Sequence, residues 1–317
     1  LSSPVLDRMS VRWLVTQVDF PLPGTPFALS SGDSSRELKP DNHLDVVVAS
    51  RPMRGVEILL VEDFFTSDLA GRLRVEVVGA DGVVRTGRRH VRGFLPAGSH
   101  WIPVAAEDLP SSGEALIRIR LDAEDGALNL KTDQLGAPVL NGMESGGRGL
   151  RLAYADDVAI WENLDALDRV RFAPEGVVIR DGQERVEMLQ AGLPSELMLL
   201  SEQSDHLTSS AAAKAVIHNF DDQLDHLNIS LTTTGPGWLV VADAMQDGWI
   251  ASVNGVDQPL VAADHALVGV PVPEGSSTVK LQYRPSGLRA GAFISVLSLA
   301  LMFSLVWRSR RTQRGTY

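Results

Sequence analysis

The chain has 317 residues, no cysteine and a formal net charge of −11 at pH 7. The length suits about two domains, and the absence of cysteine excludes disulfides, thiolate nucleophiles and cysteine metal ligands. The acidic balance argues against nucleic acid as a partner, because phosphate binding requires clustered Lys and Arg.

Residues 45–135 consist of short segments rich in β-branched residues, separated by turn residues. The segments 73–77 and 117–121 alternate between apolar and polar residues, which is typical of a strand with one buried and one wet face. Asp81-Gly82 is a strong signal for a β-hairpin. The sequence therefore predicts an antiparallel β-sandwich over 45–135.

Residues 136–149 (GAPVLNGMESGGRG) are rich in Gly, Asn, Pro and Ser, and we interpret them as an exposed connection. The segment 151–163 then has the pattern of a hairpin. A short helix is predicted near 182–191, because Asp181 can cap its free amides and Gly192 can end it.

From 211 to 283 the sequence is again made of strand segments and turns, among them the type I′ turn dipeptide Asn254-Gly255. We predict a second sandwich over 150–287 that includes the short helix.

Residues 290–307 (AGAFISVLSLALMFSLVW) form an apolar run of 18 positions without a charge or a proline. As a helix the run is roughly 27 Å long, close to the hydrocarbon thickness of a bilayer. We predict a transmembrane helix over 288–307, with Arg289, Trp307 and Arg308 at the membrane interfaces. The alternative is a buried core helix. The predicted fold class is thus mainly β, with two sandwich-like modules and one C-terminal transmembrane helix.

Arginines are concentrated after the apolar run, in the tail 308–317, whereas Arg289 alone borders its start. By the positive-inside rule the tail is cytoplasmic and the residues before 288 lie outside. The first residues contain no export signal, so we expect an upstream transmembrane bundle of the same protein. A tail-anchored cytosolic domain is the alternative.

The segments 237–249, 270–275 and 283–285 resemble the C-terminal region of YfhO-type bacterial membrane proteins, through Gly-Trp, Val-Pro-Glu-Gly and Tyr-Arg-Pro motifs. Weaker resemblances occur at 6–16 and 162–169. The departures are Leu164 and Asp168 where the family has prolines, Met245-Gln246-Asp247 where it has Tyr-Tyr-Pro, and Ser277 where it has His.

Residues 55–84 resemble the jelly-roll inserts of large bacterial membrane glycosyltransferases. The two resemblances imply a lectin-like fold for 45–135, and a leading strand and linker over 1–44 that packs on the second module. They also imply that the chain is an accessory extracytoplasmic region of a multi-pass glycosyltransferase of the GT-C type in the bacterial inner membrane. Such an enzyme uses a polyprenyl-phosphate-linked sugar, and the region would help to bind or orient the acceptor glycan.

In that family the catalytic acidic residue lies near the N-terminus, outside this sequence, so we predict no catalytic residue, cofactor or metal here. The expected partners are the lipid bilayer, the upstream bundle and a cell-envelope glycan or lipid-linked sugar. The alternative function is a single-pass anchored carbohydrate-binding or structural protein without enzymatic activity. A surface hydrolase is a third class.

Two sets of side chains are candidates for ligand contacts. Trp101, Trp161 and Trp249 could stack on sugar rings, although packing in a core is the usual role of Trp. A basic cluster could hold a phosphate or an anionic headgroup, or could simply form a polar sheet face. Its candidate residues are Arg85, Arg88, Arg89 and Arg92.

One group of possible metal ligands lies between 218 and 226, where we expect a solvated hairpin rather than a metal site. Its members are His218, Asp221, Asp222, Asp225 and His226.

Overall fold

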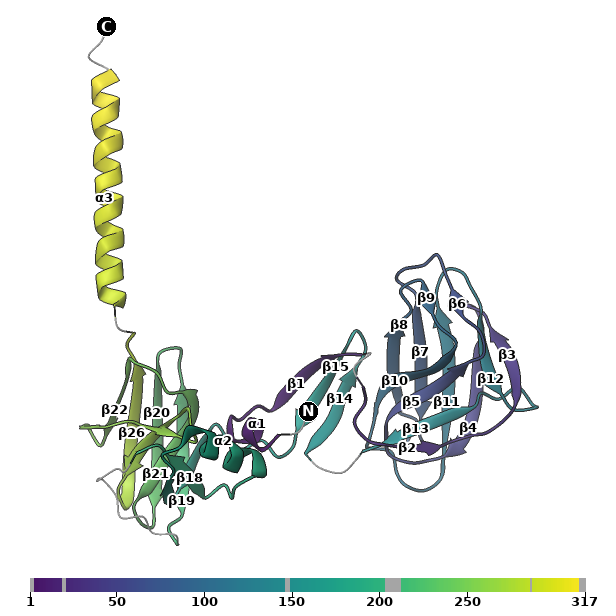
Figure 1. Cartoon of the computed structure of the whole chain (residues 1–317), viewed down its shortest axis with the longest axis horizontal. Helices are drawn as coiled ribbons and strands as arrows, with labels where there is room; N and C mark the ends of the chain where they lie inside the picture. Colours follow the sequence, from purple (N-terminus) through teal and green to yellow (C-terminus); the bar gives the residue numbers. More distant parts are fainter. Residues whose placement is uncertain (1–2, 19–20, 146–148, 203–211, 286, 314–317) are drawn as a thin grey trace. The chain divides into compact units, whose positions relative to one another are not determined.

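Strands dominate a computed structural model of the chain (Figure 1), which describes residues 3–18, 21–145, 149–202, 212–285 and 287–313. The chain divides into two compact units, Leu1–Ala166 and Leu167–Tyr317. This division lies C-terminal to the predicted module boundary at 149/150.

Two sheets enclose the main core of the first unit. One sheet has the strand order β2-β13-β5-β12-β3, with β10 also paired to β5, and the other has the order β4-β11-β7-β8. The strands of the first sheet are β2 (Thr25–Ala28), β3 (Ser34–Leu38), β5 (Met53–Leu60), β10 (Gly98–Ala106), β12 (Leu128–Thr132) and β13 (Leu140–Glu144). Those of the second are β4 (His43–Ala49), β7 (Arg72–Val78), β8 (Val84–His90) and β11 (Glu114–Asp122), and a small pair is formed by β6 (Phe64–Phe65) and β9 (Phe94–Leu95).

The core follows from the period-two patterns of these strands. On β7 the residues Leu73, Val75 and Val77 are fully buried, and on β11 Ile117 and Ile119 are fully buried, while the residues between them are partly exposed. Each segment that the sequence predicted as a strand between 45 and 122 overlaps one of these strands. The jelly-roll topology itself stays a prediction.

The segment 136–149 contains a strand, β13, which the sequence did not predict. It pairs with both β5 and β2, and Leu140 is fully buried. The physical reason is Gly142, whose missing side chain leaves room for the ring of Phe27: a Cβ there would lie 2.3 Å from Phe27 Cζ. Glycine therefore serves packing here, and the interpretation of this whole segment as an exposed connection was wrong.

A three-stranded sheet completes the first unit, with the order β1-β15-β14. Its strands are β1 (Trp13–Gln17), β14 (Leu150–Ala155) and β15 (Val158–Asn163), and the short helix α1 (Pro4–Arg8) precedes it. The hairpin predicted over 151–163 is β14–β15. Because β1 pairs with β15, these strands belong to the compact unit of the first sandwich rather than to the predicted second module.

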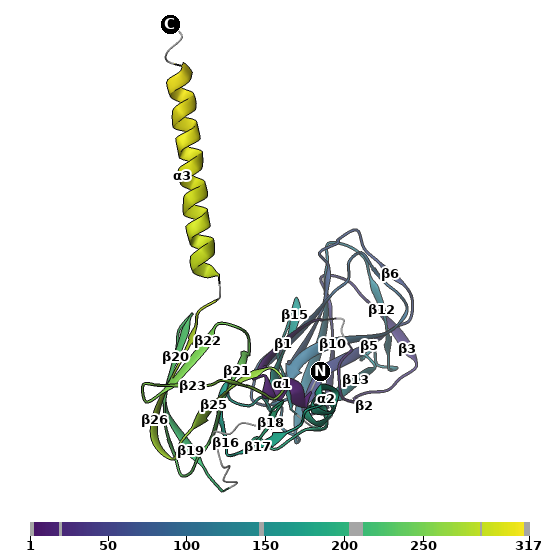
Figure 2. The same cartoon turned by 60° about the vertical axis from the view of Figure 1, so that its left-hand side comes forward.

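Two sheets also form the second unit (Figure 2), with the orders β16-β21-β25-β24-β18-β17 and β19-β20-β26-β22-β23. The first contains β16 (Val170–Ala173), β17 (Glu175–Val178), β18 (Leu197–Leu200), β21 (Gly237–Ala244), β24 (Val261–Ala263) and β25 (Leu267–Val272). The second contains β19 (Ala215–Asp222), β20 (His226–Thr233), β22 (Trp249–Val253), β23 (Val256–Gln258) and β26 (Gly275–Tyr283). Apolar residues of both sheets, such as Ile229 and Val270, share one core.

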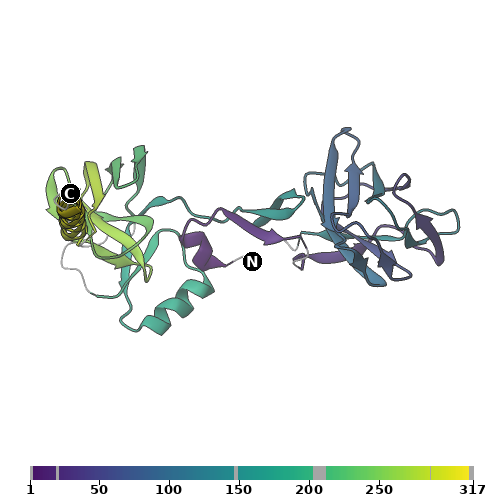
Figure 3. The ribbon, with the colours of Figure 1, turned by 90° about the horizontal axis from the view of Figure 1, so that it is seen from above.

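Helix α2 (Gly182–Ala191) joins the parallel strands β17 and β18 and lies beside the strands of the second unit (Figure 3). Its start matches the predicted cap, since the Asp181 carboxylate accepts a hydrogen bond from the Glu184 amide at 2.9 Å. It ends at Gly192, where φ is +87°.

Helix α3 (Leu288–Gln313) follows β26 after a short link. Its apolar side chains are exposed, among them Leu297, Leu301 and Phe303. In the part of the chain that the structure describes, a helix with both the length and the apolar character required to cross a membrane is not found.

Candidate functional site

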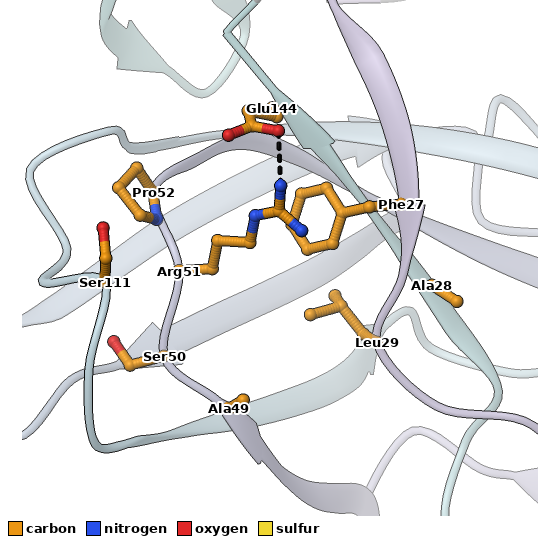
Figure 4. Close-up of a pocket in the computed structure, with 9 residues that line it drawn as sticks. All are labelled: Phe27, Ala28, Leu29, Ala49, Ser50, Arg51, Pro52, Ser111 and Glu144. Carbon is orange, nitrogen blue, oxygen red and sulfur yellow. Dashed lines mark hydrogen bonds and ion pairs between the residues drawn. The ribbon is translucent and has the colours of Figure 1, made fainter.

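A cavity of about 480 Å³ lies at the end of the first sandwich where β4 ends and β5 begins (Figure 4). Its volume is in the range of small-molecule sites. Strands β2 and β13 form one side, and the connections before β5 and β11 form the other. The lining residues are Phe27, Ala28, Leu29, Ala49, Ser50, Arg51, Pro52, Ser111 and Glu144.

Arg51 is the central polar group of this cavity. Its Nη2 donates to Glu144 Oε2 at 2.6 Å, and its guanidinium carbon lies 4.2 Å from the centre of the Phe27 ring. Figure 4 shows the Arg51 side chain extended across this ring toward Glu144. Both charged side chains are a little over 40% exposed, at 44% and 42%. The aromatic contact and the ion pair hold the guanidinium in one place while leaving it accessible.

These groups suit the binding of a neutral polyhydroxylated ligand. The guanidinium has further N–H donors, the carboxylate has a second acceptor oxygen, and charge-assisted hydrogen bonds to hydroxyl groups are strong. The Ser50 hydroxyl is occupied, because it donates to the Pro110 carbonyl at 2.8 Å. The polar side chains of the lining can thus hold a ligand through hydrogen bonds to its hydroxyl groups.

A cavity of about 660 Å³ in the second unit is lined by residues that include Arg171, Phe172 and Lys214. Arg171 is engaged in the fold there. Its guanidinium donates to the Ser195 carbonyl at 2.7 Å and forms a buried ion pair with Asp264. Arg171 is thus held by the fold, while Asp168, Glu196 and Lys214 supply the other charged groups of this cavity.

Two of the four residues of the predicted basic cluster, Arg85 and Arg88, form ion pairs. Arg85 is buried and lies between two carboxylates, with Nε 2.7 Å from Asp108 Oδ1 and Nη2 2.8 Å from Asp81 Oδ2. Hydrogen bonds to these carboxylates raise the pKa of Arg85, so its charge is permanent and already matched. Arg85 is therefore not available to an external anion.

The neighbouring Arg88 forms an ion pair with Asp156 at the turn between β14 and β15. At the same turn His90 Nε2 lies 2.9 Å from Asp157 Oδ1, and Arg72 Nη2 lies 2.9 Å from the same oxygen. The structure thus uses part of the cluster to fix the β14–β15 hairpin within the first unit.

Arg89 and Arg92 line a cavity of about 260 Å³ together with His90, Phe94 and His100. Arg89 donates to the Trp101 carbonyl at 3.1 Å, whereas Arg92 is exposed on a backbone with φ of +51°. Burial is the main cause that lowers the pKa of the His100 imidazole. An anion site at Arg89 and Arg92 stays a prediction.

The three candidate tryptophans have different surroundings. Trp161 is 1% exposed and its Nε1 donates to Thr16 Oγ1 at 3.1 Å, so it has no free face for a sugar and we withdraw it as a candidate. Trp249 is half-buried, with its ring 5.3 Å from that of Tyr283. Trp101 is half-buried on β10, and its carbonyl accepts from Arg89. Stacking on sugars by Trp101 or Trp249 stays a prediction.

The candidate membrane-interface residues are on α3. Trp307 is exposed, and the side chains of Arg289 and Arg308 lie outside the described part of the chain.

The histidines and aspartates between 218 and 226 lie on the β19–β20 hairpin. His226 Nδ1 is 2.8 Å from Asp225 Oδ1, and His218 Nε2 is 2.9 Å from Thr232 Oγ1. Across the described residues, His, Asp and Glu side chains do not gather in a group of three that could hold a metal ion.

Sequence reasoning missed the cavity around Arg51. Arg51 and Glu144 are 93 positions apart, and each lies in a segment that the sequence indicated only as a turn or a connection. The only local signal is Arg51-Pro52, which breaks the strand pattern.

Comparison with known proteins places the C-terminal half in context. Residues 196–295 match the family described as "Bacterial membrane protein YfhO". The uncharacterized protein YfhO of Bacillus subtilis (strain 168) is 26% identical over 103 residues, which are 30% of this chain and 12% of that protein. The predicted YfhO resemblance is thus confirmed within 196–295.

Two cryo-EM structures of arabinofuranosyltransferase AftD from Mycobacteria are also similar, at 11% and 12% identity. The similar regions cover 77% and 96% of this chain, and 14% and 26% of AftD, with TM-scores of 0.22 and 0.24. The chain therefore spans a small part of the length of these relatives.

Proposed function

We propose that this chain is the accessory, membrane-anchored region of a multi-pass bacterial glycosyltransferase, in which the first unit binds or orients the acceptor glycan. The YfhO match supports the membrane-protein context. The cavity around Arg51 and Glu144 is the observation that carries the binding role, because it combines accessible donors and acceptors in a volume that fits a sugar residue. The donor of the parent enzyme is a polyprenyl-phosphate-linked sugar, and its catalytic residues lie in another part of the protein.

The membrane anchor in this proposal is α3. The uncharged run 290–307 is the supporting observation, together with the exposed apolar side chains that a bilayer would cover. The arginine-rich tail after Trp307 is cytoplasmic and both β units are extracytoplasmic, in the bacterial inner membrane. The partners are thus the bilayer, a cell-envelope glycan and the upstream bundle.

The anchor is tested by flotation of the whole chain with phosphatidylcholine vesicles. We expect the chain to float, and the double substitution Leu297→Arg with Leu301→Arg to abolish flotation. The reason is that each Arg costs about 2.5–3.5 kcal/mol at the centre of a membrane helix. The control is Leu135→Arg, at a leucine that is 91% exposed in the first unit. Flotation that is unchanged in the double variant would contradict the anchor.

The glycan site is tested by screening the chain against cell-envelope oligosaccharides and titrating the best ligand by calorimetry. We expect Arg51→Met and Glu144→Gln each to weaken binding roughly 10- to 150-fold, since each removes a hydrogen bond to a charged group that is worth about 1.5–3 kcal/mol. Arg36→Met is the control, because Arg36 is exposed in the same unit and does not line the cavity.

Equal affinities of these three variants would rule out the cavity as the binding site. A chain that floats but binds no glycan would instead be a structural anchored module.

A further inference from the structure

The end of the second unit from which α3 departs is built by three segments. Strand β26 ends at Tyr283, which pairs with Trp249 at the start of β22. On its other side Gln282 pairs with His226 at the start of β20. Because both neighbours are antiparallel, the loops 223–225 and 246–248 lie at the same end of the sheet as the link to α3.

Backbone hydrogen bonds tie both loops to this link. The Tyr283 amide donates to the Asp225 carbonyl at 2.8 Å, and the Arg284 amide donates to the Gly248 carbonyl at 2.7 Å. A side chain at Gly248 is excluded, because its φ is +110° and a Cβ would lie 2.8 Å from the Arg284 carbonyl oxygen. The loops are thus fixed beside the chain that leads into the helix.

The connection to α3 is short. Tyr283 and Leu288 are five residue steps apart, which span at most roughly 18 Å when fully extended. The Leu288 amide already donates to the Pro285 carbonyl at 3.4 Å, so the link turns into the helix before Leu288. A membrane that holds α3 therefore lies next to this end of the sheet.

This end carries apolar side chains that nothing in the described chain covers. Leu224, at the tip of the β19–β20 hairpin, is completely exposed, at 108% of its reference area, and Ile250 is 46% exposed. Beside them the Tyr283 ring lies 5.3 Å from the ring of Trp249, which packs against the core of the second unit. A single exposed leucine is unremarkable in a soluble protein, but exposed Leu and Ile side chains beside the link to an apolar helix suit a membrane interface.

Several acidic side chains lie at this end, and Asp247 is exposed in the loop 246–248. Asp222 forms an ion pair with Arg169, and Asp225 Oδ1 lies 2.8 Å from His226 Nδ1. Asp221 Oδ1 accepts from Gln223 Nε2 at 2.8 Å. Charged groups next to a protruding leucine suit the hydrated headgroup region, where the charges stay in water while the apolar tip enters deeper.

We infer that the loops 223–225 and 246–248 rest in the headgroup region of the bilayer that holds α3, with the Leu224 side chain inserted at the interface. The inference rests on the proposed membrane helix α3. It adds a second contact with the membrane, which the two loops of the sheet make with the lipid headgroups. The lipid surface, not another protein, contacts this end of the sheet, because a bilayer that holds α3 must lie close to the point where the helix begins.

The absence of cysteine allows a direct test. Leu224→Cys and Val256→Cys are made in the whole chain, labelled with a polarity-sensitive fluorophore and reconstituted in phosphatidylcholine vesicles. Val256 is the matched control, because it is apolar, 62% exposed and follows the Asn254-Gly255 turn at the opposite end of β22. We expect blue-shifted emission and several-fold stronger quenching by a lipid-borne quencher at position 224 than at position 256.

Flotation of the same labelled samples distinguishes the membrane anchor α3 from the contact of the loops with the headgroups. Samples that float while both positions give the same emission and quenching would overturn the contact of the loops with the headgroup region and leave the helix anchor intact. Samples that do not float would overturn the anchor and this contact together. Near-ultraviolet circular dichroism of both variants checks that the exposed substitutions leave the fold unchanged.

Discussion

Arg54 links the sandwich of the first unit to its small sheet. It is buried, and its guanidinium donates to the Pro23 carbonyl at 3.0 Å and to the Leu150 carbonyl at 2.8 Å. Its Nε lies 2.9 Å from Glu107 Oε1, and Trp161 packs 5.4 Å from its guanidinium carbon. One side chain thus joins the strand β5 of the sandwich to the strand β14 of the small sheet.

Replacing Arg54 by Ala is expected to lower the free energy of unfolding of the first unit by about 3–5 kcal/mol, because the mostly buried Glu107 carboxylate would lose its charged partner and keep only the hydrogen bond from the Leu152 amide. The measurement is urea denaturation followed by fluorescence. Arg118→Ala is the control: it breaks an ion pair with Asp45 on the sheet surface, and exposed pairs of this kind contribute little to stability. A loss at Arg54 no larger than that of the control would contradict the linking role.

The sequence predicted the burial and the contact partners of individual side chains poorly. Trp161 stands near a turn in the sequence, which suggested an exposed platform, yet it is buried in a small core with Leu152 and Leu22. The partner of Arg51 is equally invisible, because Glu144 is brought to it only when β13 joins the sheet. Contacts between distant segments determine both the burial of Trp161 and the partner of Arg51, and local sequence patterns do not indicate such contacts.

Strands were far easier to predict than their pairing. Alternation of buried and exposed residues marks β7, β11 and β20 directly, and turn residues mark their ends. Strand β13 was missed because Gly142, Asn141 and the following glycines have low strand propensity, while its burial depends on the ring of Phe27.

Substitution Gly142→Ala tests this packing. The added Cβ would meet the Phe27 ring at 2.3 Å, so we expect a loss of about 1–3 kcal/mol in the free energy of unfolding. The double variant Gly142→Ala with Phe27→Leu relieves the overlap and should recover much of that loss, which a double-mutant cycle by urea denaturation measures. Additive effects of the two substitutions would show that the glycine has another role.

For the whole molecule, we expect acid to lower the stability of the folded state. Hydrogen bonds from Arg118 lower the pKa of Asp45, and those from Arg85 lower the pKa of Asp81 and Asp108. A carboxylate whose pKa is lower in the folded state stabilises that state above its unfolded value, near 3.9. This stability is lost as the pH falls through the lower folded value.

The melting temperature of the chain is therefore expected to be steady between about pH 5 and pH 7 and to fall steeply below about pH 4. Calorimetric scans across this range measure it. The variant Arg85→Met should melt lower at pH 7 and show a shallower decline in acid, because two of the three carboxylates have lost their partner. Parallel pH profiles of the variant and the unmodified chain would show that other groups control the decline.

Strand β26 has a mechanical consequence through its place in the sheet. It is the middle strand, paired with β20 on one side and β22 on the other, and the chain runs from its end into α3. Tension between the helix and the rest of the second unit would pull β26 along its own axis, so its hydrogen bonds on both sides would be loaded in shear at the same time. Such a joint resists force far better than a terminal hairpin, which would open one bond after another.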